Sequence, residues 1–157
     1  MEKVTFRFIS QEDILALNIP YEEVIDAVEK VMSEFSNGTC QLPVKIHVNS
    51  RPQTYVNAMP AYVGGENEAQ GMKWVAGYPE NRQKGLPVTW GVMVMNDCNT
   101  GGVQAIMDAR WITAIRTAAV AAVTAISTLE IGVRCTGNVD YTTALDGNAC
   151  ISAVFSV

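Results

Sequence analysis

The sequence predicts an α+β fold, in which an antiparallel or mixed meander sheet of about five to six strands has helices packed on it. Two segments with helical spacing precede residue 40, alternation of period two dominates from about residue 44 to 107, and an alanine-rich helical segment follows. The links between successive strand candidates are short, which favours antiparallel neighbours. With 157 residues, the chain is long enough to bury a core.

Two helices are predicted in the first forty residues. A short helix follows Ser10, whose hydroxyl is a preferred N-cap, and it runs to about Leu17. A second helix opens at Pro20 and stops at Asn37-Gly38. Its apolar residues recur every three or four positions and form one face: Tyr21, Val24, Ile25, Val28, Val31, Met32 and Phe35.

Five strand candidates follow Pro43. They cover residues 44–49, 54–61, 70–76, 88–95 and 103–107. Glycine pairs in two of the links, Gly64-Gly65 and Gly101-Gly102, indicate turns. The link over residues 77–87 is longer and polar, and binding loops tend to lie in such segments.

A third helix is predicted over residues 109–129, with Asp108 as its N-cap. Thr113, Arg116 and Thr117 are spaced so that the guanidinium and two hydroxyls share one stripe. Residues 1–130 are therefore expected to form one α+β domain. Residues 131–157 read as a divergent C-terminal segment with room for an added strand or hairpin, and they contain no glycine-rich phosphate turn.

Composition excludes several classes of function. The net charge of -5 argues against a nucleic-acid partner. No apolar run approaches the ~20 residues of a membrane helix, and the start lacks a signal-peptide pattern, so a cytoplasmic location is expected. The four cysteines are widely spaced and His47 is the single histidine, which predicts reduced cysteines, a solvated strand histidine and no metal site.

Two cations lie in apolar surroundings and suggest an anionic ligand. Lys73 interrupts a strand-like run, and Arg116 interrupts a helix of mostly Ala, Val and Ile. Each has a structural alternative: Lys73 paired with Glu80 or Asp108, and Arg116 stacked on one of two tryptophans, Trp90 or Trp111. Lys45, in the first strand candidate, reads equally well as a solvated lysine.

Six short motifs in series resemble the ornithine cyclodeaminase/mu-crystallin family over roughly residues 8–129. They are Met59-Pro60-Ala61, Met72-Lys73-Trp74-Val75, Pro79-Glu80-Asn81, Gly85-Leu86-Pro87, Asp97 to Gly101, and Thr113-x-x-Arg116-Thr117-Ala118-Ala119. The resemblance implies an N-terminal substrate-binding and dimerisation domain. In the family, a Rossmann domain follows, holds NAD or NADP and supplies the catalytic aspartate. The chain is expected to be truncated relative to that plan, so its catalytic residues stay unknown and no cofactor is expected to bind this chain alone.

The resemblance also assigns ligand contacts. Lys45, Lys73 and Arg116 would hold the carboxylate of a small amino acid, and Thr89, Arg116 and Thr117 would lie on the cofactor side. Three positions depart from the family pattern. Lys45 stands where arginine is frequent, Thr89 comes one residue later than the family threonine, and Asn57 replaces an acid of ornithine-specific members.

The function implied is that of a relative of NAD(P)-dependent amino-acid and imine oxidoreductases that convert ornithine to proline with release of ammonia. This chain is expected to be inactive by itself and to form a homodimer. The alternative is a non-enzymatic module that binds a small carboxylate or only dimerises.

Overall fold

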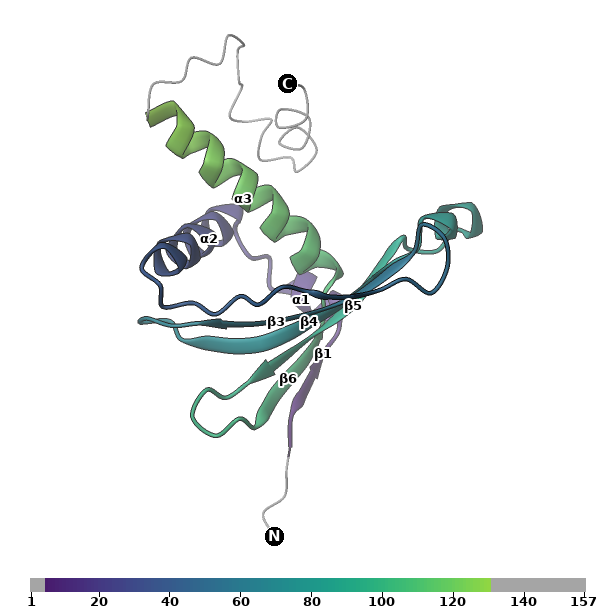
Figure 1. The fold of residues 1–157 in the computed structure, drawn as a ribbon, viewed down its shortest axis with the longest axis horizontal. Coiled ribbons are helices and arrows are strands. Elements are labelled where there is room, and N and C mark those ends of the chain that lie inside the picture. Colours follow the sequence, from purple (N-terminus) through teal and green to yellow (C-terminus); the bar gives the residue numbers. More distant parts are fainter. Residues whose placement is uncertain (1–4, 131–157) are drawn as a thin grey trace. The chain divides into compact units, whose positions relative to one another are not determined.

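The structure is a computed structural model that describes residues 5–130 (Figure 1). The described chain divides into two compact units, and each is described by itself. The first comprises residues 5–17 and 34–112, and the second comprises residues 18–33 and 113–130. The predicted C-terminal strand or hairpin, together with Cys135 and Cys150, lies outside the described residues. Cys40 and Cys98 are free thiols, as predicted.

The first unit is built on one six-stranded sheet with the order β1-β6-β5-β4-β3-β2 (Figure 1). Neighbouring strands from β2 to β6 are antiparallel, and β1 pairs with β6 in parallel. The α+β class with a mixed sheet is thus confirmed. The strands are β1 Arg7–Ile9, β2 Ile46–Val48, β3 Tyr55–Val63, β4 Ala69–Gly77, β5 Thr89–Asn96 and β6 Val103–Asp108.

Strand β1 is absent from the sequence prediction. It is only three residues long, and its partner on β6 lies about a hundred positions further along the chain. Such a strand has too few residues to show a period of two, and a non-local partner leaves no local signal. It supplies the one parallel edge of an otherwise antiparallel meander.

The register divides the side chains of the sheet between two faces. Lys73 on β4 lies opposite Met59 on β3 and Met93 on β5, so all three share a face with Asn57 and Val75. The buried members of the sheet gather on that face: Asn57, Lys73, Val75, Gly77 and Ala105. The opposite face carries large apolar side chains that remain exposed: Phe8, Ile46, Val48, Trp74, Trp90 and Val92.

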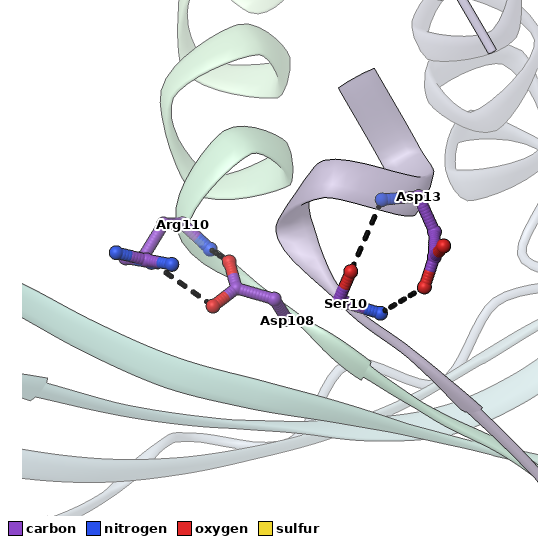
Figure 2. A network of polar contacts seen from close by, with 4 residues as sticks. All are labelled: Ser10, Asp13, Asp108 and Arg110. Carbon is purple, nitrogen blue, oxygen red and sulfur yellow. Dashed lines mark hydrogen bonds and ion pairs between the residues drawn. The ribbon is translucent and has the colours of Figure 1, made fainter. Parts of the chain in front are cut away.

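Helix α1 (Gln11–Ala16) begins with the N-cap that the sequence predicts. The Ser10 hydroxyl accepts a hydrogen bond of 3.1 Å from the Asp13 backbone N–H, and the Asp13 carboxylate accepts one of 2.9 Å from the Ser10 backbone N–H (Figure 2). Hydrogen bonds from the Ser10 backbone N–H and, to a smaller extent, from the Ser10 side chain favour the ionised carboxylate and lower the pKa of Asp13. This reciprocal pair satisfies two donors that a helix end otherwise leaves without partners.

Helix α2 (Tyr21–Ser36) ends as predicted, at Asn37-Gly38. Gly38 has a φ of 77°, its N–H donates to the Phe35 carbonyl, and the N–H of Thr39 donates to the Glu34 carbonyl. This is a Schellman termination, which requires the left-handed conformation that glycine adopts without strain. At the other end, the Pro20 carbonyl accepts from the Val24 N–H, so Pro20 occupies the N-cap position.

Helix α3 (Arg110–Glu130) starts directly after β6. The Asp108 carboxylate accepts from the Arg110 backbone N–H at 2.8 Å and pairs with the Arg110 guanidinium at 2.9 Å (Figure 2). Asp108 therefore caps the first turn, as predicted, while itself belonging to the strand. The guanidinium of Arg110 also lies 5.4 Å from the Trp90 ring. The cation beside Trp90 is thus Arg110. The structural alternative considered in the sequence analysis had Arg116 stacked on Trp90 or Trp111.

Candidate functional site

Lys73 lies in the middle of β4, in the interior of the sheet. It is 8% exposed, and it is flanked across the strands by Met59 and Met93. Asp108, one of the two partners considered for it, points to the opposite face of the sheet, because Asp108 lies opposite Val92. A buried ammonium is costly unless polar or anionic groups surround it, so this face favours anions.

Lys45 directly precedes β2 and is exposed. The register of β2 with β3 begins at Ile46, opposite Ala58, so Lys45 stands one residue outside the paired positions. Met59, the next residue of β3, lies opposite Lys73. About two strand spacings, roughly 10 Å, therefore separate Lys45 from the Lys73 Cα atom. The sheet unit brings these two predicted cations into the same region.

Thr89 opens β5 and lies opposite Gly77. It shares the face of Lys73 but stands four residues further along the sheet, roughly 14 Å away from the Lys73 Cα. The link before it forms a short 3-10 helix, η1 (Pro79–Lys84). Gly85 closes that turn with a φ of 66°, and the Asn81 side chain donates to the Pro87 carbonyl at 2.9 Å. The predicted binding loop is therefore a hydrogen-bonded turn that positions the start of β5.

Arg116 and Thr117 lie on α3 in the second unit, and both are exposed. The Thr117 hydroxyl donates to the Thr113 carbonyl at 2.8 Å, so its proton is used within the helix and its lone pairs remain available. The helix confirms the spacing on which the predicted stripe rests. A meeting of Arg116 with Lys73 stays a prediction.

His47 and Asn57 form a contact that the sequence analysis missed. They lie opposite each other on β2 and β3, and the His47 Nδ1 is 2.6 Å from the Asn57 Oδ1. Asn57 is 6% exposed, and its row adjoins that of Lys73 on the same face. His47 is exposed, as the alternation predicts, but the period leaves the cross-strand partner of a residue open. The signal was available only through the register of the β2–β3 hairpin.

Other classes of site find little support in residues 5–130. In that range, no three His, Cys, Asp or Glu side chains gather as a metal site would require. No described helix has the length and apolar character needed to cross a bilayer. The glycine-bearing turns between the strands of this part join antiparallel strands, and a dinucleotide pyrophosphate is usually held where a glycine-rich turn leads from a parallel strand into a helix.

The comparisons with known proteins agree on one family. The model of the ornithine cyclodeaminase/mu-crystallin family matches residues 7–127. The chain is 37% identical over 118 residues to the nodulation efficiency protein NfeD of Rhizobium meliloti, an alignment that covers 75% of this chain and 37% of that protein.

Two solved structures share the fold at 34% sequence identity. One is the Δ1-pyrroline-2-carboxylate reductase of Thermococcus litoralis in complex with NADH and L-proline, with a TM-score of 0.69 over 73% of this chain and 35% of that chain. The other is an archaeal alanine dehydrogenase dimer with bound NAD, with a TM-score of 0.68 over 74% of this chain and 35% of that chain. The chain thus spans little more than a third of the length of these relatives.

Proposed function

Because this chain belongs to the ornithine cyclodeaminase/mu-crystallin family, we propose that it binds the carboxylate of a small amino or imino acid. Lys73 and Lys45 supply the charge from the sheet, and Arg116 adds a guanidinium from α3. The relatives named above include NAD-linked enzymes of amino acids and cyclic imines, which supports this class of ligand.

The observation that carries the proposal is the placement of Lys73. A lysine that is 8% exposed, in an interior strand and opposite a methionine on each neighbouring strand, holds its side chain largely away from bulk water. Electrostatic attraction to a carboxylate is stronger there than at a solvated surface. Lys45, just before β2, is proposed to reinforce it as a second positive charge, and its flexible stem delivers a point charge where arginine would make two parallel bonds.

We also propose three contacts with the cofactor of the family. Thr89, Arg116 and Thr117 are proposed to lie on the nicotinamide side of bound NAD or NADP, which supplies hydride transfer in the family's enzymes. The described residues do not fit the rest of the cofactor, because they contain no strand, glycine-rich turn and helix in the order that holds a pyrophosphate. We expect this chain alone to bind neither NAD nor NADP, and to bind its ligand without converting ornithine to proline.

Calorimetric titration of the chain with L-alanine, L-proline and L-ornithine, with and without NAD, tests the proposal. Lys73→Met keeps an unbranched side chain among the methionines and removes the charge, so amino-acid affinity should fall at least about ten-fold, or 1.4 kcal/mol. Lys84→Met, in the exposed η1 turn, is the matched control and should bind as the unmodified chain does. A folded chain that binds no amino acid would contradict the carboxylate site and favour the alternative of a dimerisation module.

We also propose that the exposed apolar face of the sheet binds a second copy of this chain. Trp74 and Trp90 are 47% and 44% exposed, and the register places them on the same face as Ile46, Val48 and Val92. A contiguous apolar patch with central tryptophans is typical of a protein interface. The solved alanine dehydrogenase relative is a dimer, which supports a homodimer here.

A further inference from the structure

We propose that the His47–Asn57 pair selects a ligand whose side chain ends in an oxygen acceptor, a carboxylate or a carboxamide, and disfavours one that ends in an amine. The inference rests on the proposed function, since it concerns the far end of a ligand whose α-carboxylate is held at Lys73. The expected ligands are dicarboxylic amino or imino acids and their amides.

The hydrogen bond between the two side chains determines what Asn57 offers a ligand. Its Oδ1 can only accept, so the 2.6 Å contact requires a proton on Nδ1 of His47. The His47 ring is also held by stacking on the Tyr55 ring, at 6.2 Å between centroids. The bond to His47 occupies one of the two lone pairs of Oδ1, and the Asn57 amide nitrogen adds two donors for a ligand. Asn57 therefore presents N–H groups, which bind oxygen acceptors.

The register places this donor near the proposed carboxylate site. Asn57 is the diagonal neighbour of Lys73, since Lys73 lies opposite Met59 two residues along β3. Diagonal neighbours on one face are roughly 7–8 Å apart, a span suited to the two ends of a short amino acid. Val75, directly opposite Asn57, is buried and leaves an apolar surface between the polar groups.

The charged residues on this face support the same ligand preference. Among the strand residues that share the face of Lys73, the ionisable side chains are Arg7, His47, Tyr55 and Lys73 itself, and none is Asp or Glu. Asp108, the one acid within the six strands, lies on the opposite face. An ammonium at the far end of the ligand would find no carboxylate among these strand residues, whereas a carboxylate would meet the N–H donors of Asn57.

Titration of the unmodified chain with L-glutamate, L-aspartate, L-glutamine, L-alanine and L-ornithine tests the inference without any variant. We expect the dicarboxylates and L-glutamine to bind more tightly than L-alanine, and at least about ten-fold more tightly than L-ornithine. Asn57→Asp should then weaken L-glutamate about ten-fold and strengthen L-ornithine, while L-alanine changes little. Asn67→Asp, which adds the same charge in the β3–β4 turn, is the control and should change none of them.

Two results separate this inference from the proposed function. Equal affinity for L-glutamate and L-ornithine, lost on Lys73→Met, would overturn the selection and leave the carboxylate site standing. If none of the five amino acids binds, both the selection and the carboxylate site are overturned. If Asn57→Asp fails to fold, the ranking of the ligands on the unmodified chain still decides, because a preference for L-ornithine over L-glutamate contradicts the inference directly.

Discussion

The ring of Tyr55 on β3 occupies the space where a side chain on Gly77 of β4 would lie. The two residues are directly opposite in the register, and a Cβ atom built on Gly77 would collide with the Tyr55 Cε1 and Cζ atoms. The same ring stacks on His47. Glycine at 77 thus lets one aromatic ring cover the end of β4 and support the histidine beside Asn57.

Gly77→Ala is expected to destabilise the chain by roughly 1–3 kcal/mol, because the added methyl group must displace the Tyr55 ring. Urea denaturation followed by circular dichroism measures the change. Gly102→Ala, whose Cβ would meet only the Thr100 hydroxyl at 3.4 Å, is the matched control. In Tyr55→Ala, the collision is gone, so the same glycine substitution should cost clearly less in that background. Equal costs in both backgrounds would contradict the account.

Ser10→Ala is expected to destabilise the first unit by about 1 kcal/mol, because it leaves the Asp13 backbone N–H without its hydroxyl acceptor. It also removes one of the bonds that lower the pKa of Asp13, so the pKa of that carboxyl should move towards 3.8. Chemical denaturation and NMR titration of Asp13 measure the two effects. Ser36→Ala, at the C-terminal end of α2, provides a comparison. Unchanged stability in Ser10→Ala would argue against the cap, and an unchanged pKa of Asp13 would argue against a contribution from the Ser10 side chain.

The stability of the β5–β6 turn is expected to depend on pH through Asp97. Its carboxylate accepts from the hydroxyl and backbone N–H of Thr100, which lowers its pKa below 3.8, with Asn99 and Gln104 contributing further bonds. The unfolded chain then binds the proton first. The stabilisation is fully present above pH 3.8 and is lost as the pH falls through the lower pKa of the folded state.

Unfolding by urea at several pH values between about 2 and 6 measures this dependence. Asp97→Asn should give a shallower fall in unfolding free energy below pH 3.8 than the unmodified chain. Glu66→Gln, in the β3–β4 turn, controls for the loss of one negative charge. Identical slopes for Asp97→Asn and the unmodified chain would rule out a contribution from this turn.

Trp74→Glu is expected to turn a homodimer into a monomer, since it places a charge at the centre of the exposed apolar face. Sedimentation velocity at roughly 10–100 μM, a range in which a micromolar dimer dissociates measurably, reports the change. Gln70→Glu places a charge on the same strand away from the tryptophans and should leave the dimer intact. A monomeric unmodified chain in this range would contradict the interface.

Local signals predicted most of the elements. Ser10 supplies the side-chain oxygen that caps the start of α1, and Gly38 supplies the left-handed backbone that ends α2. Both effects involve residues only a few positions away in the sequence. The alternation along β3 to β6 follows from one face of the sheet being buried, so it is visible without any partner strand. Strand β1 could not be predicted in this way, because three residues cannot show a period and their partner lies on β6.

The candidate site was only partly accessible to such reasoning. Lys73 stands out because a charge interrupts an apolar strand, and the structure confirms its burial. The partner of the Asp108 carboxylate proved to be Arg110, and the cation beside Trp90 proved to be Arg110 as well. These pairings join side chains whose meeting depends on the path of the backbone from β6 into α3, which a list of residues leaves open.

The sequence by itself determined the α+β class, the helix ends, the alternation of the central strands and the lysine buried among them, because each depends on neighbours within a turn or two of the chain. Only the tertiary structure decided that His47 bonds to Asn57, that the strand positions beside Lys73 carry no acid and that Tyr55 covers Gly77. These follow from strand register, in which a shift of one residue would move every side chain to the other face.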